Sequence, residues 1–212
     1  MDIAQLRREY TKKKLSKKNV QTDVVEQFNR WLEEAIQANC LEPTAMVIST
    51  ISERNTPSSR VVLLKGVEDG KYVFYTNYSS RKGTHLDLNH GISALFYWPE
   101  LERQVNIEGT VEKCSAEQSD VYFNSRPWKS RIGAIISPQS QPIESRSVIK
   151  KAFVLEAAKH IGETVPRPAH WGGYQISPNR IEFWQGRPNR LHDRILYSKN
   201  DDNTWRIVRL AP

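Results

Sequence analysis

Apolar residues recur at helical spacing near the start of the chain and at a spacing of two through most of the remainder. The helical pattern is clearest after Asp23, which with Glu26 resembles a capping box. One apolar stripe follows, formed by Val24, Val25, Phe28, Trp31, Leu32, Ala35 and Ile36. A weaker pattern of Ile3, Leu6 and Tyr10 predicts a short amphipathic helix further upstream.

After Pro43 the alternation predicts a series of short strands. The clearest is 103–111, where Arg103, Val105, Ile107 and Gly109 face one side. Asp69-Gly70 is a hairpin signal between two of the strands. The predicted strands are 45–51, 60–65, 71–77, 92–98, 103–111, 174–176, 181–185, 191–197 and 205–210.

Three helices are predicted between the strands: one around Leu86, one from Ser115 to about Arg126, and one over 147–160 that Gly162 ends. Residues 127–144 are expected to be irregular, which is often a property of functional segments. These short strands with a few helices between them predict a mainly β fold, a barrel with helical insertions. We expect one domain over 21–212, preceded by a mobile basic arm over 1–20.

Composition limits the possible functions without selecting one. Of 212 residues, 31 are Lys or Arg and 24 are Asp or Glu, so the formal charge is +7 and the pI about 9.4. This excess favours anionic partners such as nucleic acid, an acidic membrane surface or phosphorylated small molecules. Much of it lies in the first eighteen residues. The two alternatives for that run are a solvated arm and an arm that folds over a negative ligand.

The chain has no long apolar stretch, and its mean hydropathy is −0.62, so no membrane span is expected. Its first ten residues lack the apolar segment of a secretory signal. Cys40 and Cys114 are far apart and form no Cys-x-x-Cys unit, which indicates a reducing compartment, the cytoplasm. The five histidines lack ligand spacing, so no metal site is expected.

Common catalytic signatures are also absent. The chain contains no Gly-x-Ser-x-Gly and no Gly-x-Gly-x-x-Gly. The segment Gly66–Lys71 is one residue short of a P-loop and lacks its Ser or Thr, so it is interpreted as a hairpin turn.

Three clusters of cations remain, and the first two suit phosphate. Arg81 and Lys82 follow Ser79-Ser80 near a predicted helix start, where two cations, hydroxyls and free N–H groups suit a phosphate dianion. A solvated basic loop is the favoured alternative for this cluster taken alone.

The second cluster is Tyr122, Arg126 and Ser130. Tyr122 and Arg126 lie four apart on one helix and share a face, so a guanidinium flanked by two hydroxyls could clamp a phosphate. Packing of the tyrosine on the arginine stem is an equally good interpretation.

The third cluster follows Trp184. If residues 191–197 form a strand that extends back to Arg190, then Arg190, His192 and Arg194 share one face. Two guanidiniums and an imidazole on a half-buried face need an anionic or π-rich partner, so here a functional interpretation is favoured over an exposed face. Together the clusters predict a phosphorylated aromatic cofactor and a phosphorylated substrate.

At these residues the chain resembles the pyridoxamine/pyridoxine 5′-phosphate oxidase family. The resemblance covers nearly the whole chain in order, and the ordered set is far more specific than any one segment. Its segments are Arg7–Tyr10, Ser59–Lys65, Phe74–Asn77, Ser80–Lys82, Glu102–Val105, Tyr122-Phe123, Ser125–Pro127, Ile132–Ala134, Ser137 with Gln139-Ser140, Trp171–Tyr174, Glu182–Gly186, Arg190–Arg194 and Arg209–Pro212.

The resemblance implies an FMN-binding split β-barrel that works as a homodimer, with FMN between the subunits. It implies oxidation of pyridoxamine 5′-phosphate or pyridoxine 5′-phosphate to pyridoxal 5′-phosphate, with O₂ reduced to H₂O₂. FMN would contact Arg60, Val61, Val62, Leu63, Leu64, Lys65, Tyr75, Thr76, Arg81, Lys82, Gln104, Gln139, Ser140, Trp184 and Arg194.

The resemblance also implies roles toward the substrate. Its phosphate would meet Lys65, Tyr122, Arg126 and Ser130, and its ring would meet Arg190, Leu191 and His192. Arg7, Arg8, Glu9 and Tyr10 would close over it. Arg190, His192 and Arg194 are the expected catalytic group, which places the substrate ring and stabilises charge on the reduced flavin.

Three other interpretations stay open from the residues. The first keeps the flavin and changes the substrate, and it gives no role to Tyr122, Arg126 and Ser130. The second is a basic barrel that binds nucleic acid and would be colourless. The third is a purely structural dimer, which gives no reason for the cations beside Trp184.

Overall fold

The computed structural model describes residues 3 and 9–212, so Arg7 and Arg8, and most of the short helix predicted near the N-terminus, lie outside the described residues. The helices are α1 Val24–Gln37, α2 Arg81–Leu88, α3 Ala116–Ser125, α4 Trp128–Ile136 and α5 Arg146–Lys159. The strands are β1 Ala45–Ile51, β2 Pro57–Leu63, β3 Gly66–Glu68, β4 Lys71–Asn77, β5 Gly91–Trp98, β6 Arg103–Lys113, β7 Trp171–Gln185, β8 Asp193–Lys199 and β9 Trp205–Leu210.

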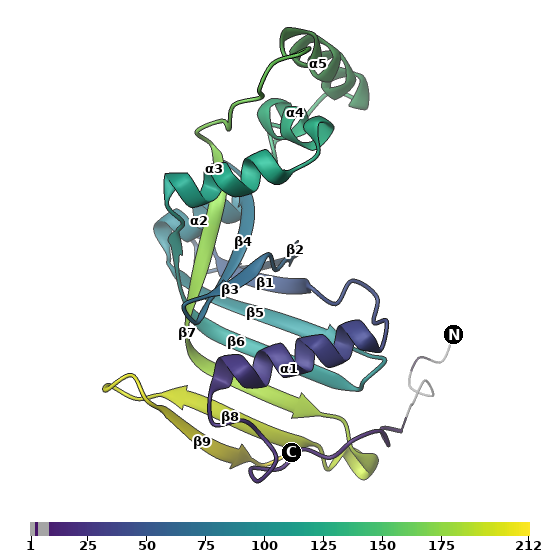
Figure 1. Ribbon diagram of the computed structural model, residues 1–212, viewed down its shortest axis with the longest axis vertical. Coiled ribbons are helices and arrows are strands. Elements are labelled where there is room, and N and C mark those ends of the chain that lie inside the picture. The colour runs from purple at the N-terminus through teal and green to yellow at the C-terminus, as the bar shows by residue number, and fades with distance from the viewer. Residues whose placement is uncertain (1–2, 4–8) are drawn as a thin grey trace.

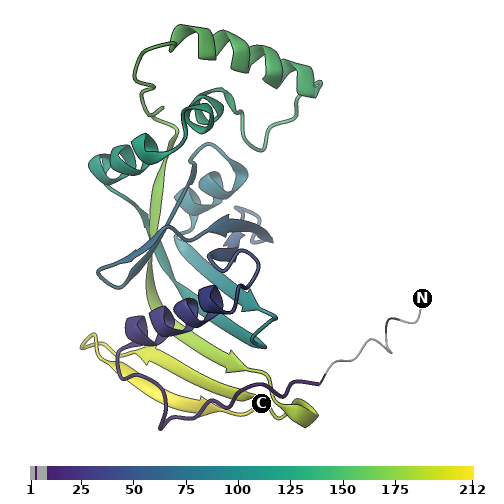
Figure 2. The same ribbon diagram turned by 45° about the vertical axis from the view of Figure 1, so that its right-hand side comes forward.

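The strands form one antiparallel sheet in the order β2-β1-β5-β6-β7-β4-β3, and β8 pairs with β7 and β9. The sheet curls into a half-barrel (Figure 1). Helices α3, α4 and α5 lie at one end of it, and β8 and β9 lie at the other (Figure 2). The long strand β7 runs from the first end to the second. The prediction of a mainly β fold with helical insertions is therefore confirmed.

Helix α1 packs in the half-barrel, as its apolar stripe predicted. The Asp23 carboxylate accepts hydrogen bonds from the N–H groups of Val25 and Glu26 at 2.8 and 2.9 Å, which caps the helix. The ring of Phe28 lies 4.9 Å from that of Tyr72, and other apolar side chains of α1 are buried with it. Ile36 was predicted in the same stripe but is 51% exposed, because it lies at the edge of the buried face.

The alternation predicted for 103–111 is confirmed, since Val105 and Ile107 are fully buried. The two strands predicted at 174–176 and 181–185 are wrong, because β7 is continuous across Pro178. The register shifts between Glu108 and Gly109 of β6, where β7 has one extra residue, Asn179, and this bulge accommodates the proline. A Cβ on Gly109 would lie 2.1 Å from the Ser177 carbonyl oxygen, so this close approach of two backbones requires glycine.

Part of the segment predicted to be irregular is helix α4. Pro127 stands at its N-cap, and Ile132 and Ala134 on the helix are buried against Phe123. The proline that ends α3 therefore also begins the next helix. Two predicted strands also shift at their starts: β2 begins at Pro57, and β8 begins only at Asp193. Among the described residues, no helix is both long and apolar enough to cross a membrane.

Candidate active site

A cavity of about 360 Å³ lies where β2, β4 and α3 approach one another. Its charged lining residues are Arg60, Lys65, Lys82 and Arg126, with no carboxylate beside them. We call this cavity the cation pocket. The other lining residues are Val61, Val62, Leu63, Tyr75, Thr76, Asn77, Tyr122, Gln139 and Trp171.

The Lys82 ammonium is held by uncharged acceptors. It donates to Gln139 Oε1 at 2.7 Å, to Thr76 Oγ1 at 3.0 Å and to Ser80 Oγ at 3.2 Å. Burial, and then the charge of Arg60, lower the pKa of Lys82 to about 8. A lysine in this state gains from an anion that restores its charged form.

Lys82 stands in the first turn of α2, whose N-cap is Ser80. The helix begins at Arg81, so the predicted position of both cations at a helix start is confirmed. Gly83 allows this turn to pack tightly, because a Cβ there would lie 1.9 Å from the Tyr78 carbonyl oxygen. The N–H groups of such a turn and the adjoining cations suit a phosphate.

Arg126 follows the last residue of α3 and lies over an aromatic face. Its Cζ is 4.5 Å from the centre of the Trp171 ring, and its buried Nη1 has no hydrogen-bond partner among the described residues. Burial lowers the pKa of Arg126. A buried guanidinium nitrogen without an acceptor is costly, and an anion entering the pocket would supply one.

Tyr75 and Tyr122 form the aromatic wall beside this arginine. Their rings stack with centroids 3.9 Å apart, and the Trp171 ring lies nearly parallel to both. Burial raises the pKa of Tyr75 to about 12, so its hydroxyl stays protonated and can donate to an anion. The pocket thus combines flat apolar walls with unpaired cations.

A second group of predicted residues gathers around Trp184, and we call it the Trp184 cluster. Gln104, Trp184 and Arg194 are cross-strand partners on β6, β7 and β8, so they share one face of the sheet. The rings of His192 and Tyr10 lie 4.6 and 5.7 Å from the Trp184 ring.

Three arginines at this end of the sheet are paired with carboxylates. Arg194 donates to both oxygens of Glu182, at 2.7 and 3.0 Å. This hydrogen bonding raises the pKa of Arg194. Arg187 and Arg209 both lie against Asp193, at 3.6 and 2.7 Å. These pairs fix the end of the sheet rather than offer free charge.

The prediction that Arg190, His192 and Arg194 follow one strand is wrong. Residues Pro188–Arg190 form a 3₁₀ turn, Asn189 and Arg190 have φ of 57° and 61°, and the strand begins only at Asp193. His192 nevertheless reaches the cluster, because its Nδ1 accepts a hydrogen bond from the N–H of Arg187 at 3.1 Å. Burial, and then Arg190, lower the pKa of His192, so the ring is neutral with its proton on Nε2.

The described part of the N-terminal arm is bound to this end of the sheet. The N–H groups of Thr11 and Lys12 donate to Glu102 Oε2 at 2.8 and 3.0 Å, and that of Leu15 donates to Asp193 Oδ2 at 3.0 Å. The Tyr10 ring fills a notch at Gly186, where an added Cβ would lie 2.7 Å from it.

Several predicted residues lie outside the cation pocket. Leu64 is buried in the core, and Arg81, Ser130 and Ser140 do not line the cavity. Sequence reasoning missed Asn77 and Trp171 as lining residues. Both belong to segments that carried the family resemblance, Phe74–Asn77 and Trp171–Tyr174, so a signal for them was present.

The cation pocket and the Trp184 cluster lie at opposite ends of β7. Trp171 is its first residue and Trp184 its last but one, and a strand of 15 residues spans roughly 45 Å. Figures 1 and 2 both show β7 joining the helical end to the β8–β9 end. One chain therefore does not bring its own two groups into one cavity.

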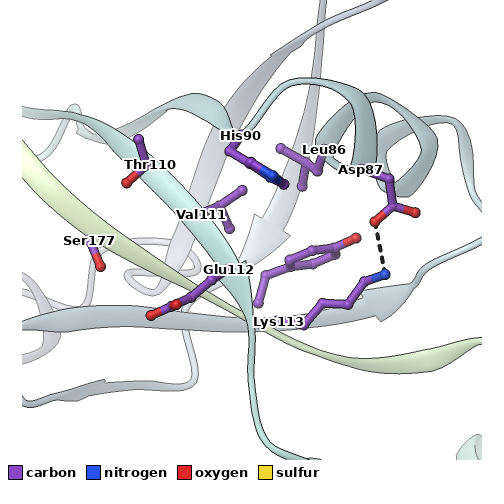
Figure 3. Close-up of a pocket in the computed structure, with 9 residues that line it drawn as sticks. Leu86, Asp87, His90, Thr110, Val111, Glu112, Lys113 and Ser177 are labelled. Atoms are coloured by element: carbon purple, nitrogen blue, oxygen red, sulfur yellow. Dashed lines mark ion pairs between the residues drawn. The ribbon is translucent and has the colours of Figure 1, made fainter.

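A larger cavity of about 560 Å³ contains none of the predicted site residues (Figure 3). Leu86, His90 and Val111 line it, and its lysine, Lys113, is 2.8 Å from Asp87. Because that pair is already satisfied, this cavity lacks the unpaired charge that distinguishes the cation pocket. Among the described residues, no group of three or more His, Cys, Asp or Glu could hold a metal ion.

Comparison with known proteins identifies the family of this chain. Residues 32–158 match the family described as "Pyridoxamine 5′-phosphate oxidase", and residues 171–212 match "Pyridoxine 5′-phosphate oxidase C-terminal dimerisation region". The chain is 58% identical to a pyridoxine/pyridoxamine 5′-phosphate oxidase of Bacteroides thetaiotaomicron, covering 100% of this chain and 99% of the relative. It is 56% identical to one of Bacteroides fragilis, covering 100% and 90%.

Two solved structures are similar in fold. PhzG from Burkholderia lata, in complex with tetrahydrophenazine-1-carboxylic acid, is 28% identical with a TM-score of 0.87, covering 94% of this chain and 98% of PhzG. A pyridoxamine 5′-phosphate oxidase-related, FMN-binding protein of Nostoc punctiforme is 13% identical with a TM-score of 0.71, covering 87% and 97%. The second likeness concerns the fold alone, the split barrel predicted from the resemblance.

Proposed function

The chain belongs to the pyridoxamine 5′-phosphate oxidase family, and from that premise we propose that it uses FMN to oxidise pyridoxamine 5′-phosphate or pyridoxine 5′-phosphate to pyridoxal 5′-phosphate, reducing O₂ to H₂O₂. The observation that carries this proposal is the cation pocket, in which four cations line a cavity beside aromatic rings and none faces a carboxylate of the lining. Phosphorylated aromatic molecules match that combination of charge and flat walls.

The residues fit the phosphate of FMN and that of the substrate. The buried Arg126 Nη1 without an acceptor, and the lowered pKa of Lys82, are what an absent anion would leave behind. Arg60, Arg81 and Lys82 would hold the flavin phosphate. Lys65, Tyr122, Arg126 and Ser130 would hold the substrate phosphate. The remaining flavin contacts would be residues 61–64, Tyr75, Thr76, Gln104, Gln139, Ser140, Trp184 and Arg194.

A homodimer would assemble the complete site. The outward face of the sheet carries exposed apolar side chains: Val61 is 64% exposed beside the cation pocket, and Tyr97 is 53% exposed beside the Trp184 cluster. By strand register, Tyr97 shares this face with Gln104, Trp184 and Arg194. A second copy packed on this face would bring its Trp184 cluster to the first copy's cation pocket, with FMN between them.

FMN, when bound, supplies the hydride acceptor and passes the electrons to O₂. The residues of this chain would position the substrate against the flavin. Two clamped phosphates would fix the substrate carbon against the flavin ring, which lowers the entropic part of the barrier. His192, neutral and with its proton on Nε2, would donate a hydrogen bond to the substrate ring, and Arg190 would lie beside it. Arg194, held by Glu182, would face charge that develops on the flavin.

The arm would exclude water from the assembled site. We propose that residues 21–212 are the single FMN-binding domain and that residues 1–20 are an arm whose Glu9 and Tyr10 lie nearest the substrate, with Arg7 and Arg8 just before them. Tyr10 on the Trp184 and His192 rings supports this role. We also propose a cytoplasmic location, which agrees with two buried free cysteines.

The test is to purify the protein, saturate it with FMN and add substrates without oxygen. Pyridoxamine 5′-phosphate should bleach the flavin spectrum, and admitting O₂ should restore the spectrum and release pyridoxal 5′-phosphate and H₂O₂. Pyridoxamine without the phosphate is the matched control and should react far more slowly at equal concentration. A protein that binds no FMN, or that bleaches equally with both compounds, would contradict the proposal. Equal bleaching would point instead to a flavin enzyme for another substrate.

A further inference from the structure

A chain of hydrogen bonds runs from the cation pocket into the protein interior. Arg60 donates through Nη1 to Thr50 Oγ1 at 2.7 Å and through Nη2 to Ser58 Oγ at 2.9 Å. Thr50 Oγ1 lies in turn 3.0 Å from Nδ1 of His85, a residue of α2. Thr50 is fully buried and His85 is 6% exposed.

Strand register explains why these side chains meet. Thr50 on β1 lies directly opposite Ser58 on β2, and Arg60 is two residues further along β2. The three side chains therefore share the inward face of the strand pair, whereas Val61 points outward. Helix α2 covers this face and adds the imidazole of His85.

The chemistry of the guanidinium fixes the direction of the first hydrogen bond. A guanidinium only donates, so Thr50 Oγ1 must accept from Arg60. The hydroxyl has one hydrogen, and His85 Nδ1 is its other hydrogen-bonding neighbour. We assign the hydroxyl's hydrogen to Nδ1, which makes His85 neutral with its proton on Nε2.

Charge supports the same assignment. The charged groups near His85 are Arg81 on its own helix and Arg60 on β2, and its neighbour on β1 is Thr50. Burial, and then the two arginines, lower the pKa of His85 below its ordinary value, whereas a hydrogen bond with the Thr50 backbone acts in the opposite direction. Arg60 is thus held by two hydroxyls and a neutral imidazole, none of which cancels its positive charge.

We propose that Thr50 and His85 are positioning residues for the flavin phosphate: they orient the Arg60 guanidinium through a chain of uncharged hydrogen bonds. This inference rests on the proposed function, which gives Arg60 to that phosphate. Protonation of His85 would remove the acceptor of the Thr50 hydroxyl and put a third positive charge beside Arg60 and Arg81. The hydrogen bonds that orient Arg60 then weaken, so the affinity for a phosphate falls as the pH decreases.

Two matched pairs of variants test the chain of hydrogen bonds. Thr50→Val removes the hydroxyl and Thr50→Ser keeps it; His85→Leu removes the acceptor and His85→Gln supplies an amide oxygen in its place. His90→Gln is the control for the histidine pair, because His90 is an exposed residue on the other cavity (Figure 3). Circular dichroism checks that each variant is folded.

The measurement is binding of FMN and of riboflavin, which lacks the phosphate, to the full-length protein freed of flavin, followed by flavin fluorescence at pH 8. We expect Thr50→Val and His85→Leu to weaken FMN binding about tenfold and to leave riboflavin binding within twofold. The other three variants should match the parent. If Thr50→Val or His85→Leu fails to fold, the pair of variants at the other position tests the proposal.

A pH series adds a second readout. From pH 8 to 5.5 the parent should lose more FMN affinity than His85→Gln, whereas protonation of the phosphate itself affects both proteins alike. Equal losses for FMN and riboflavin, unchanged FMN affinity in the removal variants, or identical pH profiles would overturn the inference. Failure of the parent to bind FMN at all would instead overturn the proposed function.

Discussion

The cation pocket and the Trp184 cluster contain the same kinds of residue, arginine beside aromatic rings, but the partners of the arginines differ. In the pocket, Arg60 and Lys82 are held by hydroxyl and amide oxygens, and Arg126 keeps a buried nitrogen without an acceptor. In the cluster, Arg194 is held by Glu182 and Arg209 by Asp193.

This difference separates arginines that are available to a ligand from arginines that stabilise the fold. A buried cation held by neutral groups keeps its charge for a ligand, whereas one held by a carboxylate is already compensated. The pocket is therefore the place where we expect an anion to bind. The cluster is the place where aromatic rings and the N-terminal arm are fixed in position.

Replacing Arg126 should give the largest effect on substrate binding. Arg126→Ala removes a charged hydrogen bond to the substrate phosphate, which contributes on the order of 2–3 kcal/mol, so KM should rise about 30- to 150-fold with a smaller change in kcat. Steady-state kinetics with pyridoxamine 5′-phosphate measure it. Arg146→Ala, at an exposed arginine that begins α5, is the control and should leave KM unchanged. A kcat loss as large as the KM rise would contradict a binding role.

The same two regions should differ in stability. Arg194→Ala leaves the Glu182 carboxylate buried and unpaired, so the free energy of unfolding of the flavin-free protein should fall by about 2 kcal/mol. Arg126→Ala removes a cation that has no carboxylate partner, so it should change that free energy by less than about 1 kcal/mol. Urea unfolding compares them.

Adding Glu182→Gln to Arg194→Ala should restore part of the loss, because the stranded charge is then gone. If the two arginine variants lose equal stability, the distinction between paired and unpaired cations fails.

Filling the Gly186 notch should release Tyr10 from the Trp184 cluster. An added methyl group would overlap the Tyr10 ring, so Gly186→Ala should raise KM about tenfold by displacing the arm. Tryptophan fluorescence should also report a more exposed Trp184. Gly133→Ala is the matched control, because its Cβ would meet nothing within 4 Å. Equal effects of the two substitutions would show that the notch has no special role.

The smallest expected effect is a loss of FMN affinity at alkaline pH. The pKa of Lys82 is lowered from 10.5 to about 8, so its charge is lost as pH rises through about 8. FMN affinity should then fall roughly threefold to fivefold between pH 7 and 9, whereas Lys82→Arg should show no such decline.

Deprotonation of Lys82 affects the stability of the flavin-free protein with the opposite sign to its effect on FMN affinity. Between pH 8 and 10.5 the unfolded chain binds a proton that the folded pocket does not, so the flavin-free protein should become more stable as pH rises in that window. Titrations of FMN binding and urea unfolding across this range check both signs.

Features that depend on neighbours in sequence were predictable. The Asp23 cap, the apolar stripe of α1, the Asp69-Gly70 hairpin and the alternation in β6 are each set within a few residues. The cations at the start of α2 followed from the same local signals. The prediction that Tyr122 and Arg126 share a helix face is wrong, because Arg126 lies just beyond α3 in extended conformation, although both residues line the cation pocket. Eleven of the thirteen residues that line the cation pocket were predicted, but most of them through the family resemblance rather than from spacing.

Predictions failed where a distant part of the chain overrides a local signal. Pro178 suggested a break, yet β7 continues because it bulges at Asn179, opposite Glu108 and Gly109 of β6. Residues 128–136 looked irregular, yet Ile132 finds a buried site against Phe123 and forms helix α4. Arg190 and His192 suggested a strand, yet Pro188 begins a turn.

The amino-acid sequence by itself determined the mainly β architecture, the excess of positive charge and the cationic residue types that we propose bind phosphate, because each depends on composition or on a short repeat. Only the tertiary structure decided which cations meet a carboxylate, because Glu182 faces Arg194, and Thr50 faces Arg60 and His85, through strand register and helix packing. It also set the two groups of site residues at opposite ends of β7, since an extended strand of that length keeps its two ends far apart whatever its side chains are.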